Sequence, residues 1–109
     1  MSIAVIEKQE TTLNVSPEGR LDAIRTPALE NEILPYLEDT DRIVMDFSKV
    51  EFISSACFRL LMLLEQSMEN RGGEVQVVRA NEEVLHIIDV AGFANVVRVI
   101  GEGEEGTAP

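Results

Sequence analysis

Cysteine, histidine and tryptophan are almost absent from this chain, and their scarcity excludes several kinds of site. The one cysteine, Cys57, cannot form an internal disulfide, and beside the single histidine, His86, it leaves no ligand set for a multi-cysteine zinc site. No apolar run is long enough to cross a bilayer, and the N-terminus lacks the basic start and apolar stretch of a signal peptide. We therefore expect a cytoplasmic protein that holds no metal and no cofactor.

Basic residues are also few. Nine Lys and Arg stand against twenty Asp and Glu, which gives a formal charge of −11. An acidic surface repels phosphate backbones and anionic lipid headgroups, so we expect no direct binding to nucleic acid or to membranes. The charge is compatible with a partner that presents a basic surface, and its simplest interpretation is solubility.

The length allows one domain. With 109 residues, of which 45% are hydrophobic, the chain can bury a single core without help from a metal or a disulfide. We expect this domain to span residues 1–100. Residues 101–109 are acidic and rich in glycine, which predicts a flexible C-terminal tail.

The apolar pattern predicts five strands and three helices. Runs of β-forming residues and alternation favour strands, and apolar residues three or four apart favour helices. The predicted strands span residues 3–7, 12–16, 41–48, 75–79 and 96–100, and the predicted helices span residues 26–37, 54–71 and the segment between Asn81 and Gly92.

Turn and capping residues indicate the boundaries. Residues 16–19, Ser-Pro-Glu-Gly, are typical of a turn. Thr26 before Pro27 is typical of an N-cap followed by proline at the first helical position, and Pro35 should bend or shorten the end of that helix. Gly72-Gly73 should end the long helix, whose apolar residues cover most of its circumference and indicate burial or an interface.

The element order is therefore β-β-α-β-α-β-α-β. Strands separated by helices need crossover connections, so part of the sheet should be parallel, while the first two strands can pair antiparallel. We predict an α/β fold with a mixed sheet and helices packed mainly on one side.

No enzyme constellation can be assembled from these residues. His86 lies on a helix between two apolar residues, where a partly exposed helix position is the simplest interpretation. Cys57 falls among apolar helix residues and reads as a small buried hydrophobe; a pKa lowered by the helix N-terminus, with mild redox sensitivity, is the alternative. Without a nucleophile–base pair, we predict a protein that is not an enzyme.

Two serines stand at the start of the long helix. Ser54 is placed to be the N-cap, with its hydroxyl accepting from a backbone N–H of the first turn. Ser55 would then be the first helical residue and project outward. A phosphate there would meet unsatisfied N–H groups and bring about −1.5 to −2 charge onto a surface where a partner could dock. The alternative, favoured by these residues alone, is that both serines simply cap the helix.

Five segments have the order and spacing of a known family. They are Gly19-Arg20-Leu21-Asp22, Ile43-Val44-Met45-Asp46-Phe47-Ser48-Lys49-Val50, Phe52-Ile53-Ser54-Ser55-Ala56, Gly72-Gly73-Glu74-Val75 and Asp89-Val90-Ala91-Gly92-Phe93. Together they resemble the STAS domains of bacterial anti-sigma factor antagonists, and the resemblance spans about residues 5–100. It implies the STAS fold.

The resemblance also implies a partner-switching function in transcription regulation. In this family the unmodified antagonist binds an anti-sigma factor that is also a serine-protein kinase, and so frees the sigma factor. The kinase phosphorylates the antagonist at the start of the long helix and the complex separates; a serine phosphatase restores the active form. Nucleotide and magnesium belong to the kinase, and we expect the antagonist itself to be a monomer or weak dimer.

The junction departs from the family pattern. The family often has Asp-Ser-Ser-Gly or Asp-Ser-Thr-Gly where this chain has Ser54, Ser55, Ala56 and Cys57. The usual acceptor is thus replaced by Ala56, and members with one serine directly after the aspartate use the position of Ser55. The resemblance implies Ser55 as the phosphorylation site, with Ser54 the second choice. The implied partner-binding residues are Asp22, Ser54, Ser55, Ala56 and Phe58, although Phe58 also fits the core.

The missing hydroxyl at Ala56 supports one alternative. The chain would then be a STAS accessory subunit or scaffold that is never phosphorylated and serves a permanent transporter or stress-sensing complex. Neighbouring genes would distinguish the two functions.

Overall fold

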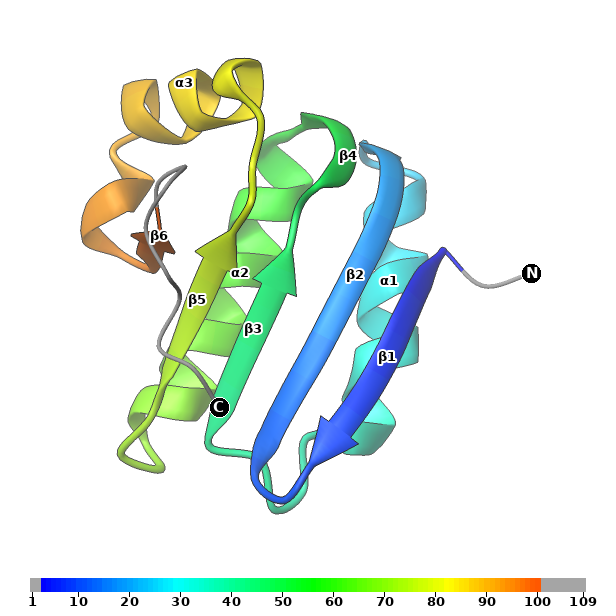
Figure 1. Ribbon diagram of the computed structural model, residues 1–109, viewed down its shortest axis with the longest axis vertical. Helices are drawn as coiled ribbons and strands as arrows, with labels where there is room; N and C mark the ends of the chain where they lie inside the picture. The colour runs from blue at the N-terminus through cyan, green and yellow to red at the C-terminus, as the bar shows by residue number, and fades with distance from the viewer. Residues whose placement is uncertain (1–2, 101–109) are drawn as a thin grey trace.

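The computed structural model describes residues 3–100, in which a mixed six-stranded sheet carries helices on one face (Figure 1). The strands are β1 (Ala4–Gln9), β2 (Thr12–Leu21), β3 (Arg42–Asp46), β4 (Lys49–Ile53), β5 (Glu74–Val78) and β6 (Arg98–Ile100). The helices are α1 (Arg25–Ile33), α2 (Ser55–Glu69) and α3 (Glu82–Val90), with short 3-10 helices η1 (Leu34–Tyr36) and η2 (Phe93–Asn95). The predicted tail, residues 101–109, lies outside the described residues.

The sheet has one antiparallel pair and is otherwise parallel. β1 pairs antiparallel with β2, and β3, β5 and β6 follow in parallel order. β2 has two parallel partners along its length, β3 beside residues 12–15 and β4 beside residues 18–21. The predicted mixed α/β fold is confirmed, and the structure adds one strand, β4, to the predicted five.

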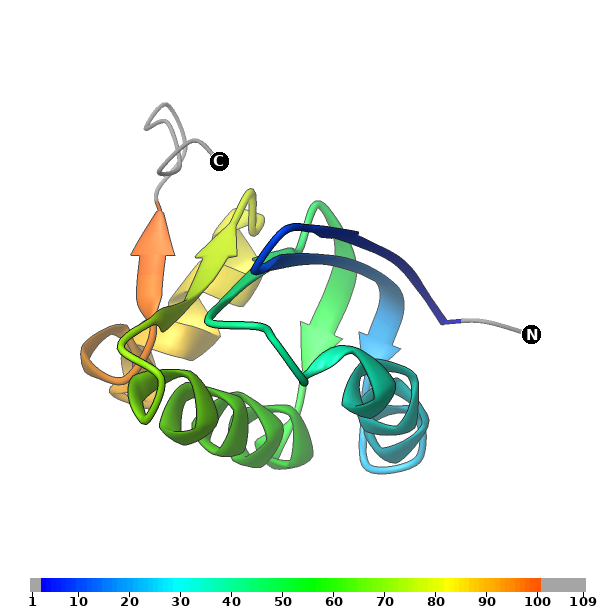
Figure 2. The same cartoon turned by 90° about the horizontal axis from the view of Figure 1, so that it is seen from below.

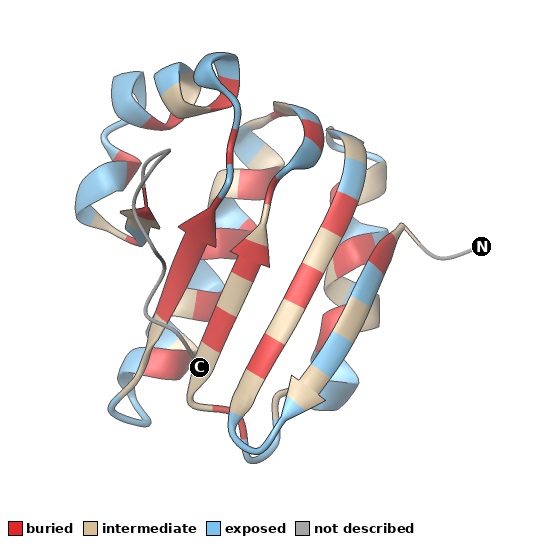
Figure 3. Ribbon diagram, viewed as in Figure 1, coloured by how far each residue is buried: buried red, intermediate tan, exposed pale blue. Residues whose placement is uncertain are grey.

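The helices lie on one side, as the sequence predicts. Figure 2 shows α1 and α2 side by side under the sheet, and Figure 1 places α3 beyond the carboxyl ends of the parallel strands, where it packs on β4. Buried and partly exposed residues alternate along β2 and β3, so each strand turns one row of side chains into the core (Figure 3).

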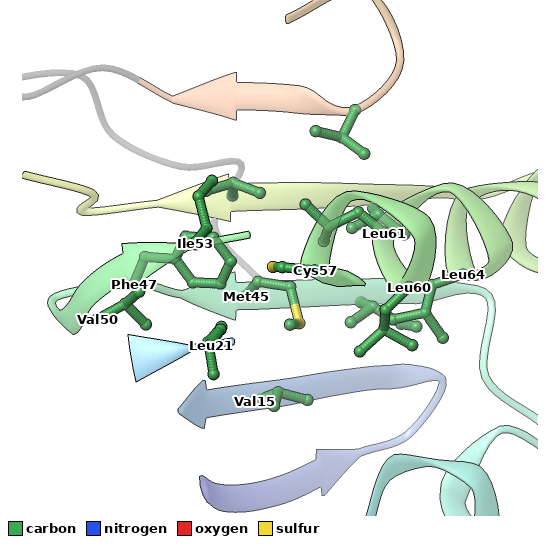
Figure 4. Packing of buried hydrophobic residues seen from close by; sticks show 14 of the residues in the cluster. Val15, Leu21, Met45, Phe47, Val50, Ile53, Cys57, Leu60, Leu61 and Leu64 are labelled. Atoms are coloured by element: carbon green, nitrogen blue, oxygen red, sulfur yellow. The ribbon is translucent and has the colours of Figure 1, made fainter. Parts of the chain in front are cut away.

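The core forms between the sheet and α2. Val15 and Met45 from the strands are fully buried, as are Cys57 and Leu61 from the helix (Figure 4). Burying an aliphatic side chain of this size stabilises a fold by about 1.5–3 kcal/mol. The apolar periodicity of α2 therefore serves mainly to fix this helix on the sheet.

The predicted turn at residues 16–19 is wrong, because β2 continues through it. Gly19 has φ +83°, and the register between β2 and β4 shifts between Gly19 and Arg20. The glycine thus accommodates a bulge at which β2 passes from β3 to β4. The segment before the two serines is strand β4, which is not among the five predicted strands.

The start of α1 also differs from the prediction. Thr26 is not the N-cap: the helix begins at Arg25, and Thr26 is buried in its first turn. The capping acceptor is Asp22, because its carboxylate lies within reach of the first N–H groups. The predicted effect of Pro35 is confirmed, since α1 ends at Ile33 and the chain tightens into η1.

The cap of α3 and the ends of the two later helices agree with the sequence. The backbone N–H of Val84 donates to Oδ1 of Asn81 at 2.8 Å, and Gly92, with φ +76°, follows the end of α3. α2 ends at Glu69, just before Gly72-Gly73. His86 is exposed on α3, as expected.

Candidate partner-binding site

The junction between β4 and α2, residues 52–58, holds both candidate serines. Ile53 is buried at the end of β4, and Ser54 follows in extended conformation, with φ −111° and ψ 177°. Ser55 is the first residue of α2. Because β4 is hydrogen-bonded to β2, the start of α2 lies beside the end of β2 at Leu21.

Ser54 occupies the N-cap position, but its hydroxyl does not cap the helix. Oγ donates to the carbonyl oxygen of Leu21 at 2.8 Å, and the backbone N–H of Ser54 donates to the same oxygen at 3.1 Å. The predicted bond from a first-turn N–H to this hydroxyl is therefore wrong. The reason is tertiary: the carbonyl at the end of β2 offers the hydroxyl an acceptor that a sequence pattern cannot show.

Ser55 has the opposite environment. Its side chain is exposed on the first turn of α2, and its hydroxyl has no hydrogen-bond partner within residues 3–100. The free N–H groups of a helix's first turn and the dipole favour negative charge at this position. Of the two hydroxyls, that of Ser55 is the accessible one.

Asp22 organises the neighbouring turn. Its Oδ1 accepts from the backbone N–H groups of Ile24 at 3.0 Å and Arg25 at 2.8 Å, and its carbonyl accepts from Thr26 N–H at 3.0 Å. The bond from the Arg25 N–H holds the pKa of the Asp22 carboxyl below its usual value. Since Asp22 directly follows Leu21, the structure brings this turn and Ser54 together.

The remaining junction residues face inward to different degrees. Ala56 is partly buried, and so is Phe58, whose ring lies 4.4 Å from that of Phe93, centroid to centroid, at an interplanar angle of 46°. Phe58 is thus held against η2, which limits its freedom as a docking residue.

Cys57 is buried against the sheet, as expected (Figure 4). Burial raises the pKa of its thiol to about 12, because a thiolate would lose its hydration there. The alternative of a thiol activated by the helix N-terminus is therefore wrong. Burial therefore has a larger effect on the pKa of this thiol than the helix dipole has.

Three exposed apolar side chains were not singled out in the sequence. Ile24 in the Asp22 turn is 84% exposed, and Met62 and Leu63 on α2 are 45% and 49% exposed. Met62 and Leu63 belong to the apolar circumference of the long helix, and periodicity alone does not say which part of it faces solvent. An isoleucine directly after Asp22-Ala23 in a turn is the signal that could have marked Ile24.

Two absences concern the described residues alone. Within residues 3–100 no group of three or more His, Cys, Asp or Glu side chains is placed to hold a metal ion. Over the same range no helix has both the length and the apolar character to cross a membrane.

A mostly parallel mixed sheet with helices on one face is the architecture of the STAS class of domains. The family model described as "Mlab, STAS domain" matches residues 4–100, and the chain belongs to this STAS domain family. The match covers every strand and helix of the structure.

Similar proteins include anti-sigma factor antagonists. The anti-sigma-B factor antagonist of Bacillus subtilis strain 168 is 21% identical over 107 residues, which cover 97% of this chain and 98% of that protein. An anti-sigma factor antagonist from Mycobacterium paratuberculosis has a TM-score of 0.76 at 26% identity, covering 88% of this chain and 82% of that one.

The anti-sigma factor antagonist SpoIIAA of Bacillus has been solved in two forms with the same fold. The unphosphorylated form has a TM-score of 0.77 at 16% identity and covers 91% of this chain and 89% of its own. The phosphorylated form has a TM-score of 0.68 at 15% identity and covers 91% of this chain and 92% of its own.

Proposed function

We propose that this chain is an anti-sigma factor antagonist that binds an anti-sigma factor with serine kinase activity and is released when Ser55 is phosphorylated. The observation that carries the proposal is the exposed Ser55 hydroxyl on the first turn of α2, in a domain similar to known antagonists. The chain acts in the cytoplasm and catalyses nothing. A serine phosphatase returns it to the binding form.

The two serines differ as phosphate acceptors. In the transfer, Oγ forms the new bond to the γ-phosphorus of ATP, ADP leaves, and the hydroxyl proton passes to the kinase. Oγ of Ser54 is engaged with Leu21, so its reaction would first break that bond. Oγ of Ser55 reacts without this loss, which supports Ser55 as the acceptor and Ser54 as the second choice.

A phosphate on Ser55 would act on the partner interface more than on the fold. Its charge is compatible with the N-terminus of α2, so the helix should remain formed. The same charge would lie on the surface that includes Asp22, Ala56 and Phe58, where an apolar partner surface would lose contact through desolvation and repulsion.

The acceptor is tested by phosphorylation. A tagged chain is used to capture the kinase from native lysate, the kinase is produced recombinantly, and the chain is incubated with it and ATP. Phosphopeptide mass spectrometry should find one phosphate at Ser55, which Ser55→Ala abolishes and Ser54→Ala retains. Modification of Ser55→Ala at an unchanged rate would rule out Ser55.

The switch is tested by calorimetry with the same kinase. The unmodified chain should bind with a Kd between about nanomolar and micromolar, and Ser55→Asp should weaken binding at least about tenfold. Asn70→Asp is the matched control, because it adds the same charge at the other end of α2. Equal affinities of the three chains would argue against phosphorylation as the switch.

Ala56 supports one alternative function. Without the family's usual acceptor hydroxyl, the chain could be a STAS subunit of a permanent transporter or stress-sensing complex. Capture of a permease in place of a kinase would favour that function, and size-exclusion chromatography would test the expected monomer or weak dimer.

A further inference from the structure

Strand β5 is buried on both faces, unlike the strand beside it. Buried and partly exposed residues alternate along β3, but Val75 to Val78 in β5 are four consecutive buried residues (Figure 3). Val75 and Val77 belong to the core between the sheet and the helices. Gln76 and Val78 therefore point to the opposite face, because successive side chains of a strand alternate. Their exposed fractions there are only 0% and 4%.

Ile100, at the end of β6, extends this second buried region. It pairs in register with Val78, is 5% exposed and, like Val78, is buried without belonging to the core cluster. We call Gln76, Val78 and Ile100 the open-face patch. Figure 2 shows α1 and α2 on the other face of the sheet, and α3 packs on β4. The helices of residues 3–100 therefore do not account for the burial of the open-face patch.

The Gln76 side chain indicates what a covering segment has to supply. Its Nε2 donates to Oε2 of Glu74 at 2.7 Å, but its Oε1 is buried and has no hydrogen-bond donor within residues 3–100. A buried amide oxygen without a donor costs free energy, so a cover with free N–H groups is favoured. Extended backbone offers such groups at each residue except proline.

The residues that follow Ile100 are in reach of this patch. Ile100 belongs to the patch, so residue 101 starts next to it, and the nine residues 101–109 can span up to about 30 Å when extended. The three side chains are buried within a single copy of the chain, so no second copy is needed to explain their burial.

The charges on the two sides are complementary. Residues 101–109 contain Glu102, Glu104 and Glu105 and no basic residue. Arg42 and Arg98 lie on the open face beside the patch, because Arg42 is in register with Glu74 and Arg98 with Gln76. In a chain of formal charge −11, an acidic segment is attracted to a face that holds two guanidinium groups.

We propose that residues 101–109 dock in extended conformation on the open-face patch and close the helix-free face of the sheet over β5 and β6. Parallel strands are almost always covered on both faces, and β3, β5 and β6 are parallel. The docked segment covers Val78 and Ile100 and brings N–H groups to Oε1 of Gln76. The docking is independent of the proposed function, because it involves neither Ser55 nor a partner protein.

The docking is tested by ¹⁵N relaxation of the full chain. The backbone order parameters of residues 102–105 should exceed about 0.6 if the segment is docked. Val78→Asp should lower them below about 0.6, because a carboxylate on the patch must stay hydrated and repels an acidic segment. Val44→Asp is the matched control: Val44 lies on the same face of β3 but is only half-buried, and its variant should keep the order parameters of the unaltered chain.

Three outcomes would overturn the proposal. Order parameters below about 0.6 in the unaltered chain would show the flexible tail that the composition of this segment predicts. Equally high values in both variants would mean that the segment is ordered away from the open-face patch. Values that rise with protein concentration would place the segment on a second copy. Because no partner protein is present, each of these outcomes would leave the proposed function untouched.

Discussion

The hydroxyl of Ser54 donates a hydrogen bond of 2.8 Å to the carbonyl oxygen of Leu21, 33 residues earlier in the chain. This bond joins the N-terminus of α2 to the end of β2 and to the Asp22 turn beyond it. The two adjacent serines therefore differ: the Ser54 side chain is bonded to another strand, and the Ser55 side chain is exposed.

Removing the two hydroxyls should therefore have different effects. Ser54→Ala loses the bond to Leu21 and should lower the free energy of unfolding by about 1 kcal/mol. Ser55→Ala removes an exposed hydroxyl and should change it by less than about 0.5 kcal/mol. Urea denaturation followed by circular dichroism measures both, and a larger loss for Ser55→Ala would contradict the assignment.

Asp22 should stabilise α1 through its carboxylate. Asp22→Ala removes the acceptor of two backbone N–H groups and should lower the free energy of unfolding. Asp22→Asn keeps an oxygen acceptor, so its loss should be smaller. Equal decreases in the free energy of unfolding of the two variants, measured in urea, would contradict the role of the side-chain oxygen as the capping acceptor.

Acid should destabilise the fold through two carboxylates. Burial alone would raise the pKa of Asp46, but the hydrogen bond from the Ser48 N–H and the Arg79 guanidinium, 3.1 Å away, outweigh burial and lower it. The pKa of Asp22 is lowered chiefly by the hydrogen bond from the Arg25 N–H. A lowered folded-state pKa means that the stabilisation is fully present above the ordinary value of 3.8 and is lost as pH falls below it.

The Tm should accordingly stay constant between about pH 7 and pH 5 and fall below about pH 4. There the unfolded chain, whose carboxyl pKa values are higher, binds more protons than the folded chain, and this favours unfolding. Asp46→Asn should lower the Tm at neutral pH and flatten the acid limb of the curve. A Tm that rises on acidification below pH 4 would contradict the direction of both pKa shifts.

Cys57 should be chemically silent in the folded protein. Its thiol is buried and has a pKa raised to about 12, so the reactive thiolate is scarce at neutral pH. Iodoacetamide at about pH 8 should leave the native mass unchanged and add one adduct in denaturant. Rapid alkylation of the native chain would mean that the start of α2 opens readily.

The two glycines after α2 should differ in their tolerance of alanine. A Cβ on Gly73 would lie 1.5 Å from the carbonyl oxygen of Asp41, so Gly73→Ala forces the backbone apart and should prevent stable folding. Gly72 has φ +79° and open space around it, so Gly72→Ala should introduce backbone strain that lowers the free energy of unfolding by only about 1–2 kcal/mol. Thermal unfolding compares the two, and similar midpoints would contradict this ranking.

The features predicted correctly from the sequence depend on near neighbours. Asn81 caps α3 through an N–H three residues away, and Pro35 shortens α1 within one turn. The apolar periodicity of α2 and the β-rich run of β3 are equally local signals, and together they gave the mixed sheet with its helices on one face.

The features predicted wrongly depend on strands that are distant in sequence. Residues 16–19 contain the residues of a turn, yet pairing with β4 draws them into β2 with a bulge at Gly19. β4 itself, Lys49–Ile53, is a strand because β2 is beside it. Thr26 has the residue type of a cap, but Asp22 accepts from the N–H groups of Ile24 and Arg25, so the helix begins before Thr26.

The sequence by itself determined that two serines open the long helix and that the same helix carries the apolar residues that pack on the sheet. Only the tertiary structure decided that the Ser54 hydroxyl is bonded to Leu21 and that the exposed Ser55 hydroxyl has no partner within residues 3–100. The physical reason is that a hydroxyl's partner and a side chain's exposure depend on which distant segment lies next to it, here the end of β2, and local periodicity contains no information about that neighbour.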